Sequence, residues 1–287
     1  MLILASCGKQ KGDYDASGVF EAIEVMVSAQ ASGEILQWDV TEGQALQIGQ
    51  QVGQIDTVQL QLKKEQLLAN IKASGSRTYD VALQIAAIKQ QIVQQQTDLA
   101  RVQALLQVGG APQKQVDDIQ SSITVLQRQL AAQESTLRNN NSGIVSESEA
   151  LQIQIAQIED QIEKSRMVAP ITGTVLSKYA ELGELAAPGK ALFKMADLDH
   201  LFLRAYITAD QLTQLKLNQE VSVFADFGKQ EMKKYTGHIT WIADKAEFTP
   251  RTVLTKNERA NLVYAVKIAV KNDGYLKIGM YGEIKIR

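Results

Sequence analysis

The sequence contains one segment of about 28 residues twice, at a constant offset of 140 positions. The first copy, Ala29-Gln-Ala-Ser-Gly33-Glu-Ile35-Leu36, returns as Ala169-Pro-Ile-Thr-Gly173-Thr-Val175-Leu176. Two later glycines of the first copy, Gly43 and Gly49, match Gly183 and Gly189 without a gap. Alternating apolar residues and evenly placed glycines predict short strands joined by turns. Two matching β units so far apart are most simply two halves of one small domain with a long insertion between them.

The insertion between the two copies has a heptad pattern, which is typical of a coiled coil. The spacing of four and three residues holds at Val81, Ile85, Ile88, Ile92, Gln95, Leu99, Val102 and Leu106. It resumes at Val116, Ile119, Ile123, Leu126, Leu130, Gln133 and Leu137. Between the two runs, Gly109 and Gly110 suit a helix end, and Pro112 suits a first helical turn. We therefore predict a helical coiled-coil hairpin over residues 57–167, with its tip near 107–113.

An antiparallel hairpin requires facing residues whose numbers have a constant sum. This holds for Leu106 with Val116, Leu99 with Ile123, Ile85 with Leu137, Ile71 with Leu151, Leu67 with Ile155, and Leu60 with Ile162. Two interruptions, Ser74–Ser76 and Asn139–Gly143, lie opposite each other in this register. We expect one hairpin with a matched weak joint, which is either a functional hinge or a solvated kink. Each arm of about 50 residues would reach roughly 75 Å.

The region after the second copy alternates between apolar and polar residues, which predicts strands. The runs are Leu201–Ile207, Val221–Phe224, Tyr235–Ile242, Leu262–Val270 and Met280–Ile286. Thr208–Leu217 predicts one short helix, and Asn272-Asp273-Gly274 predicts a hairpin turn between strands. Five or six strands with one helix predict a small β barrel, to which Val19–Val27 would add a strand.

These patterns together predict an elongated protein of the mixed α and β class. A tether would occupy residues 1–17, and an N-terminal strand with the first half of the sandwich would occupy residues 18–56. The hairpin follows at 57–167, the second half of the sandwich at 168–197, and the barrel at 198–287.

Composition and the scarcity of reactive residues argue against an enzyme, a metal centre or a nucleic-acid-binding protein. The formal net charge is −2 over 287 residues, so there is no basic surface for nucleic acid. With a single cysteine, Cys7, the chain forms neither an internal disulfide nor a thiolate cluster. His200 and His238 have no partner at ligand spacing, and the sequence has no phosphate-binding loop and no nucleophile elbow. We predict no catalytic residue, no metal and no cofactor, with Trp38 and Trp241 as packing residues.

The paired halves resemble the biotinyl/lipoyl carrier fold, and Ala169–Val175 is close to the opening of that fold's second half. Carrier domains place an acceptor lysine at the turn between the halves, flanked by Met or by Asp and Ala. Here the hairpin replaces that turn, and Lys63 and Lys64 lie on a helical pattern. Asp244-Lys245-Ala246 lies well outside the repeat. Carrier chemistry is therefore expected to be absent.

A split lipoyl-like domain with a hairpin at its tip and a barrel after it resembles the HlyD-type membrane fusion proteins. These are periplasmic adaptors of efflux and type I secretion systems, and the resemblance covers residues 18–287. Glu247–Pro250 together with Glu258–Tyr264 resembles a subfamily associated with ABC-type exporters. The resemblance implies an ABC-type inner-membrane permease and a TolC-type outer-membrane channel as partners. It also implies a homo-oligomeric ring, with six copies as the expected number.

Adaptors of this family dock their hairpin tips through an Arg, a Leu four residues on and a Ser seven further. Arg101 and Leu105 match this pattern, whereas Pro112 occupies the third position. The predicted docking tip comprises Arg101, Leu105, Gly109, Gly110, Pro112 and Asp117. Alternatively, Leu105 flanks the seam and Arg101 is a solvated cation near a helix C-terminus.

Leu4-Ala5-Ser6-Cys7-Gly8 resembles a bacterial lipobox, which implies lipidation at Cys7 and anchoring to the inner membrane of a Gram-negative bacterium, on its periplasmic side. Alternatively Cys7 lies in an apolar stub, because residues 1–6 are shorter than the roughly 7–15 apolar residues of an export signal. Two other functions stay open, a coiled-coil scaffold or chaperone and a lipoyl/biotinyl carrier.

Overall fold

The computed structural model describes residues 14–228, 231–248 and 262–286. The chain divides into two compact units, Met1–Asp56 with Ser165–Arg287, and Thr57–Lys164. The first unit holds a split β sandwich and a small β barrel, and the second is a helical hairpin. This confirms the predicted mixed α and β class and its three components.

The sandwich is built from two four-stranded sheets, and each sheet takes strands from both copies of the repeat. The first half supplies β2 (Glu24–Ser28), β3 (Gly33–Trp38), β4 (Ala45–Leu46) and β5 (Gln51–Ile55). The second half supplies β6 (Arg166–Val168), β7 (Gly173–Lys178), β8 (Leu185–Ala186) and β9 (Ala191–Ala196). The sheet orders are β2-β9-β7-β4 and β6-β5-β3-β8, so each half completes the sheet of the other.

Backbone hydrogen bonds between the halves follow the same pattern in both directions. The N–H of Gly43 donates to the carbonyl of Val175, and the N–H of Gly183 donates to the carbonyl of Ile35, each at 2.9 Å. Both glycines are left-handed, with φ of 83° at Gly43 and 82° at Gly183, a conformation that glycine adopts without a steric penalty. The sequence repeat is therefore the two halves of one domain, as predicted.

The sandwich core is apolar and closed, and the insertion leaves it from neighbouring strands. Ile35 and Phe193 are fully buried, and the ring of Trp38 packs edge-on against Phe193 at 6.0 Å, in agreement with its predicted packing role. Strand β5 pairs with β6, and the Ile55 N–H donates to the Ser165 carbonyl at 2.9 Å. The two ends of the insertion therefore meet side by side on one sheet.

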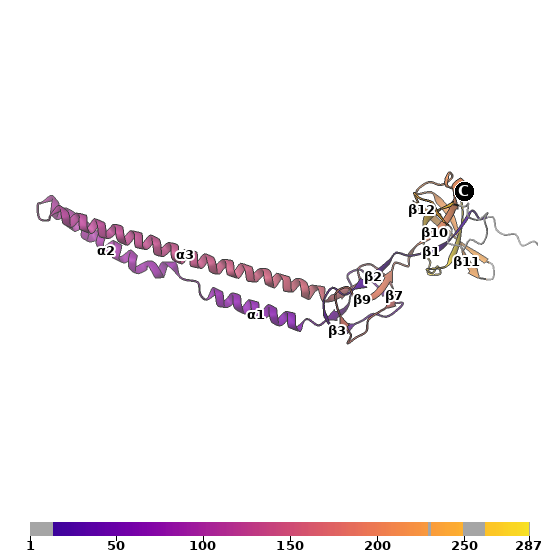
Figure 1. The fold of residues 1–287 in the computed structure, drawn as a ribbon, viewed down its shortest axis with the longest axis horizontal. Helices are drawn as coiled ribbons and strands as arrows, with labels where there is room; N and C mark the ends of the chain where they lie inside the picture. The colour runs from indigo at the N-terminus through magenta and orange to yellow at the C-terminus, as the bar shows by residue number, and fades with distance from the viewer. Residues whose placement is uncertain (1–13, 229–230, 249–261, 287) are drawn as a thin grey trace, which may run out of the picture. The chain divides into compact units, whose positions relative to one another are not determined.

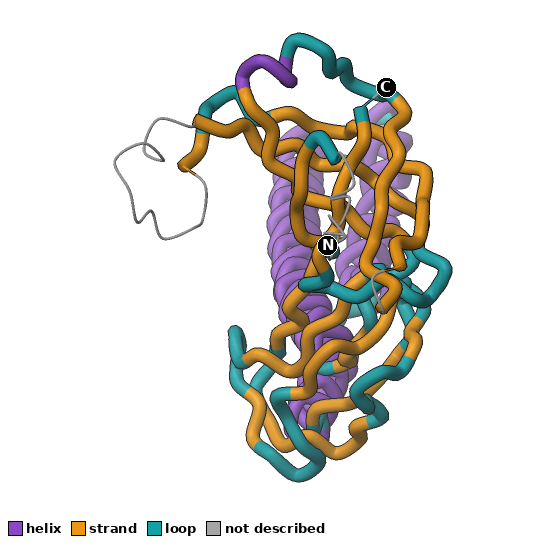
Figure 2. Tube along the Cα trace, turned by 90° about the vertical axis from the view of Figure 1, so that its right-hand side faces the viewer, coloured by secondary structure: helices purple, strands orange, loops and turns teal. Residues whose placement is uncertain are grey.

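The barrel is formed by a sheet that has seven strands in the described residues. They are β1 (Ala16–Glu21), β10 (His200–Thr208), β11 (Glu220–Gly228), β12 (Glu231–Ile242), β13 (Glu247–Phe248), β14 (Leu262–Lys271) and β15 (Tyr281–Lys285). Their order is β10-β1-β15-β11-β12-β14-β13, and pairing of β10 with β14 closes six of them into a barrel, with β13 paired to β14 alone. The predicted helix is short, α4 (Ala209–Leu212), and begins with a capping box between Thr208 and Gln211 (Figure 2, the short purple segment at the top). Trp241 is 40% exposed under the Lys267 ammonium, so its predicted packing role is wrong.

The N-terminal segment Val19–Val27 forms two strands, not the single strand that the sequence predicted. Strand β1 pairs with β10 and β15, and its Phe20 lies fully buried in the barrel core. Strand β2 pairs with β9 instead, where Val25 and Val27 pack against the sandwich core. The described chain thus passes from the barrel to the sandwich between β1 and β2, because Phe20 and the two valines complete different cores.

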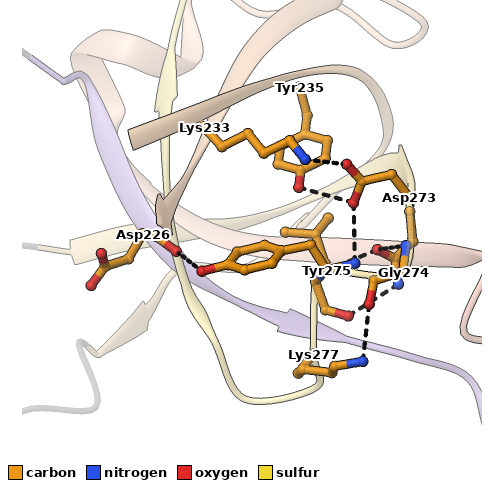
Figure 3. Close-up of polar contacts among 9 residues, drawn as sticks. Asp226, Lys233, Tyr235, Asp273, Gly274, Tyr275 and Lys277 are labelled. Atoms are coloured by element: carbon orange, nitrogen blue, oxygen red, sulfur yellow. Dashed lines mark hydrogen bonds and ion pairs between the residues drawn. The ribbon is translucent and has the colours of Figure 1, made fainter. Parts of the chain in front are cut away.

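The predicted hairpin turn at Asn272-Asp273-Gly274 is wrong, because β14 and β15 are not paired with each other. The connection instead packs Leu276 into the barrel core and is held by side-chain hydrogen bonds (Figure 3). The Asp273 carboxylate accepts hydrogen bonds from the Lys233 ammonium and, at 3.1 Å, from the Tyr235 hydroxyl. The bond to Lys233 lowers the pKa of Asp273, and the same bond raises the pKa of Lys233. The Lys233 ammonium also lies 5.4 Å from the Phe227 ring centre.

The hairpin contains three helices, α1 (Val58–Gly75), α2 (Val81–Gln107) and α3 (Gln113–Lys164). Helices α1 and α2 follow one another along α3 (Figure 1). The predicted facing pairs are in contact beside α1, where buried Leu67, Ile155 and Ile158 pack with Leu60, Ile71, Leu151 and Ile162. The 52 residues of α3 span about 78 Å at 1.5 Å each.

Two predictions for the hairpin seam need correction. Only the first arm is interrupted, since Asn139–Gly143 lie inside α3. The predicted seam residue Gln133 is exposed, and its neighbour Glu134 is the half-buried one. The Lys89 ammonium lies 3.8 Å from the Glu134 carboxylate across the seam, which explains why a charged residue is accepted there.

Candidate docking tip of the helical hairpin

The turn between α2 and α3 is built by two glycines. The Gly110 N–H donates to the Leu105 carbonyl at 2.8 Å, and the Gly109 N–H donates to the Leu106 carbonyl at 3.0 Å. Gly109 has φ of 75°. These bonds and this dihedral form a Schellman motif, which satisfies the last carbonyls of α2 and turns the chain at once.

The start of α3 is ordered by its own first turn. Pro112 immediately precedes the helix, where its missing N–H is no loss, and its carbonyl accepts a hydrogen bond from the Gln115 N–H at 3.1 Å. The Gln113 side-chain amide donates to the Asp117 carboxylate at 2.8 Å. A carboxylate in this position also complements the positive end of the helix dipole.

The turn exposes apolar side chains beyond the last buried layer of the seam. Val102 and Val116 are buried at 8% and 5% exposure, and they close the hairpin core at this end. Past them, Val108 is 79% exposed and Leu105 is 46% exposed. The tip therefore presents a short apolar ridge that the hairpin itself does not cover.

Arg101 lies one helical turn before Leu105 on α2, and its side chain is 69% exposed. Its guanidinium donates to the Asp98 carboxylate at 3.2 Å. An exposed pair of this kind is worth little, so the guanidinium can exchange Asp98 for another acceptor. The structure thus places Arg101, Leu105, Gly109 and Gly110 along the end of α2.

The other two predicted tip residues, Pro112 and Asp117, lie at the start of α3. Val108 was missed by the sequence reasoning. The signal was available, since Val108 is an aliphatic residue directly before Gly-Gly that falls outside the heptad spacing. An apolar residue that the seam does not need is a candidate for contact with a partner.

The two histidines lie on different strands of the barrel, β10 and β12. His200 Nδ1 lies 2.8 Å from the Asp197 carboxylate, whereas His238 is exposed on β12. Within the described ranges, no group of three His, Cys, Asp or Glu side chains could hold a metal ion. No helix of the described part combines the length and hydropathy needed to cross a bilayer.

The three lysines considered as carrier attachment sites do not lie at a turn of the sandwich. Lys64 lies on α1 and pairs with Glu159 at 2.6 Å, and Lys245 lies between β12 and β13 of the barrel. Lys63 is exposed on α1. The predicted lipidation residue Cys7 lies outside the described residues, as do Thr249, Pro250 and Glu258–Asn261 of the subfamily pattern.

A β sandwich split by a helical hairpin and followed by a small barrel is the architecture of a membrane fusion protein. Residues 23–197 match the family of RND membrane fusion proteins through its barrel-sandwich hybrid domain. This match spans more than half of the chain, so the chain belongs to that family.

Relatives with known sequences or structures agree with this assignment. A UPF0194 membrane protein of Citrobacter koseri is 28% identical over 279 residues, covering 89% of this chain and 83% of the relative. MacA from Actinobacillus actinomycetemcomitans shares the fold, with a TM-score of 0.58 at 19% identity over 95% of this chain and 78% of that one. The membrane fusion protein Spr0693 of Streptococcus pneumoniae R6 shares it with a TM-score of 0.53, at 18% identity over 94% and 97%.

Proposed function

We propose that this membrane fusion protein is a periplasmic adaptor that links an ABC-type inner-membrane exporter to a TolC-type outer-membrane channel. Its role is structural, and export is driven by the transporter. The observation that carries the proposal is the uncovered apolar tip of the hairpin, formed by Leu105 and Val108. A tip of this kind gains stability by burying its apolar surface against a partner.

The chemistry of the tip suits the ends of other helices. Leu105 and Val108 offer apolar area, and the exposed Arg101 guanidinium offers charged donors for carbonyl or carboxylate groups. The short Gly109-Gly110 turn adds no bulk, so a partner can approach the backbone closely. A channel that ends in helical hairpins would meet these features directly.

Assembly into a ring is supported by apolar residues on the sandwich surface. Leu36 on β3 and Leu185 on β8 are 50% and 72% exposed, and these two strands are paired. Leu182, in the turn before β8, is 62% exposed. Such a patch fits contact between sandwich units of neighbouring copies, and six copies are the expected number.

Anchoring to the inner membrane would come from a lipid on Cys7. A single acyl chain gives only marginal membrane binding. Several lipid-anchored protomers in one ring would bind the membrane more tightly. Replacement of Cys7 by Ser is expected to move the protein from the membrane fraction to the soluble periplasmic fraction. Continued membrane association without the other partners would rule out the lipid as the main anchor.

The proposal is tested by photocrosslinking in cells, with the crosslinking residue placed at Gln107 or Gln113 on either side of the turn. The expected product contains an outer-membrane channel protein. Gln90 is the matched control, because it is an exposed glutamine far from the turn on α2. Channel products from Gln90 alone, or none from either tip position in well-expressed protein, would contradict tip docking and favour a scaffold or chaperone.

A carrier function is separated by intact mass. After co-expression with a lipoyl or biotin ligase, the mass of the sandwich-containing chain is expected to be unchanged. An added lipoyl or biotinyl group would show a carrier function and contradict a purely structural role.

A further inference from the structure

The joint between α1 and α2 interrupts a seam whose spacing does not change. Helix α1 ends at Gly75 and α2 begins at Val81. Ile71 and Ser74 point into the seam before the break, and Val81 and Ile85 continue the same heptad spacing after it. No residue has been inserted or lost, so the break is not required by a change of register.

The interrupted backbone is held by one side chain of α3. The Tyr79 N–H donates to the Asn141 side-chain oxygen at 2.9 Å, and the Asn141 amide donates to the Tyr79 carbonyl at 2.8 Å. Asn141 is half-buried at a seam position of a helix that runs unbroken past this point. Both backbone groups of Tyr79 are therefore satisfied by Asn141 in place of helical partners.

Two further side chains stabilise the interruption. The Asp80 carboxylate accepts a hydrogen bond from the Leu83 N–H at 3.2 Å and so caps α2. The Arg77 guanidinium donates to the Ser74 hydroxyl and to the Glu147 carboxylate of α3, each at 2.8 Å. Ser74 is only 2% exposed, so this bridge reaches into the seam.

The same segment is already close to helical. The Arg77 N–H donates to the Ser74 carbonyl at 3.0 Å, and the Thr78 N–H donates to the Gly75 carbonyl at 3.2 Å. These are bonds of the 3₁₀ type, which often border α-helices. Asp80 is extended, with φ of −76° and ψ of 98°, and would have to rotate to join α1 and α2, whereas no residue from 76 to 80 is proline or glycine.

We propose that this joint is a two-state latch set by Asn141. In the open state described above, only α3 crosses this level of the hairpin, so the tip can bend relative to the base. In the closed state, residues 76–80 become helical and two helices cross it, which stiffens the hairpin. Because the seam keeps its register, closure requires no sliding of either arm along the other.

The two states are balanced by opposed hydrogen bonds. Closure gives the Tyr79 N–H and carbonyl helical partners, but it removes both partners of the Asn141 amide. An unsatisfied half-buried amide disfavours the closed state, whereas an apolar side chain at 141 would favour it by completing the seam. Asn141 thus keeps open a joint that the heptad pattern would otherwise close. The inference concerns the hairpin alone and does not depend on the proposed partners.

Trypsin can test the latch on the full chain. Within residues 57–164, all of which the structure describes, Arg77 is the basic residue that lies outside a helix. Cleavage after Arg77 therefore reports the population of the open joint. Asn141→Leu is expected to slow this cleavage about tenfold, the order expected from losing one pair of hydrogen bonds in the open state, and to raise helicity by circular dichroism.

Two variants complete the experiment. Asn140→Leu changes an exposed neighbour on α3 and is expected to be cut at the native rate. Asp80→Ala removes the cap of α2 without touching the seam, and it is expected to slow cleavage as well, which keeps the test decisive if Asn141→Leu folds poorly. Cleavage at the native rate or faster in Asp80→Ala, or equal slowing in Asn140→Leu, would overturn the latch.

Discussion

The two halves of the sandwich form equivalent hydrogen bonds, whereas the two arms of the hairpin share a seam register but differ in backbone continuity. Gly43 and Gly183 donate equivalent hydrogen bonds across the sandwich at the same distance. In the hairpin, α3 is continuous but the opposite arm is broken between Gly75 and Val81. A shared β ladder forces its two contributors to agree, because each strand supplies the partners of the other.

The hairpin permits asymmetry because each helix satisfies its own backbone and meets its neighbour only through side chains. A break in one arm then costs only the bonds of that turn, and one asparagine can replace them. Burial follows the same contrast, with Ile35 fully buried in the sandwich and Ile155 still 8% exposed in the seam. Four measurements would break or sharpen this comparison.

The largest effect is expected from removing a core side chain in the sandwich. Ile35→Ala should lower the free energy of unfolding by about 4 kcal/mol, and Ile155→Ala by about 2 kcal/mol, because the seam can relax around a smaller residue. Urea denaturation monitored by circular dichroism measures both. Equal losses at the two positions would show that the seam is packed as rigidly as the sandwich.

Adding one methyl group should lower the free energy of unfolding in the sandwich and raise it in the hairpin. A Cβ at Gly173 would lie 2.4 Å from the Ala196 carbonyl oxygen, whereas a Cβ at Gly143 on α3 would meet no atom within 4 Å. Gly173→Ala should therefore destabilise the protein by about 3 kcal/mol, and Gly143→Ala should stabilise the helix by about 1 kcal/mol. A destabilising Gly143→Ala would show that the matched break, predicted on α3 as well, is present in solution.

A smaller effect is expected at the tip. Gly109→Ala places a side chain at φ of 75° and should reduce the stability of the adjoining helix ends by about 1 kcal/mol. Gly110→Ala is the matched control, since Gly110 is not left-handed and its Cβ would approach the Leu105 carbonyl no closer than 3.4 Å. Hydrogen exchange of the amides at 105–116 separates the two variants. Faster exchange in the control alone would contradict the Schellman assignment.

The smallest effect is a pH dependence that only one half of the sandwich should show. The Lys190 ammonium donates to Glu184 at 2.8 Å and lowers the pKa of that carboxyl, whereas Gln44 and Gln50 occupy the equivalent positions. A lowered folded-state pKa stabilises the fold above the unfolded pKa, and this contribution is lost as pH falls through the folded value. Glu184→Gln should remove that increment and leave the stability flatter as pH falls below about 5. If the pH dependence of stability were the same in Glu184→Gln, Glu184 would not be its source.

The repeat and the hairpin register were predictable from the sequence because each rests on a pattern of apolar residues. Glycines at fixed offsets marked the turns, and facing pairs such as Leu67 and Ile155 marked the register. Both are local signals, repeated often enough to be read without knowing any tertiary contact. The predicted tip residues likewise fall around the turn, although their contact with a partner stays a prediction.

Three features could not be predicted, because each depends on a contact between distant residues. Asn141 reads as a helix breaker in sequence, yet it is helical and serves Tyr79 of the other arm. The connection after β14 reads as a tight turn, yet Asp273 is held by Lys233 on another strand. Phe20 and Val25 read as one strand, and only the two cores that they enter separate them.

The two ends of the hairpin are joined by the pairing of β5 with β6 and by the hydrogen bond from Ile55 to Ser165. This closure affects how the length of the hairpin can change in evolution. From the side of the sandwich, everything between these two residues is a single loop whose ends are already joined, and lengthening a closed loop adds little entropic penalty. Arms can therefore grow or shrink in steps of seven residues on each side while the seam stays aligned. One sandwich can in this way carry hairpins of different lengths without any change to its own core.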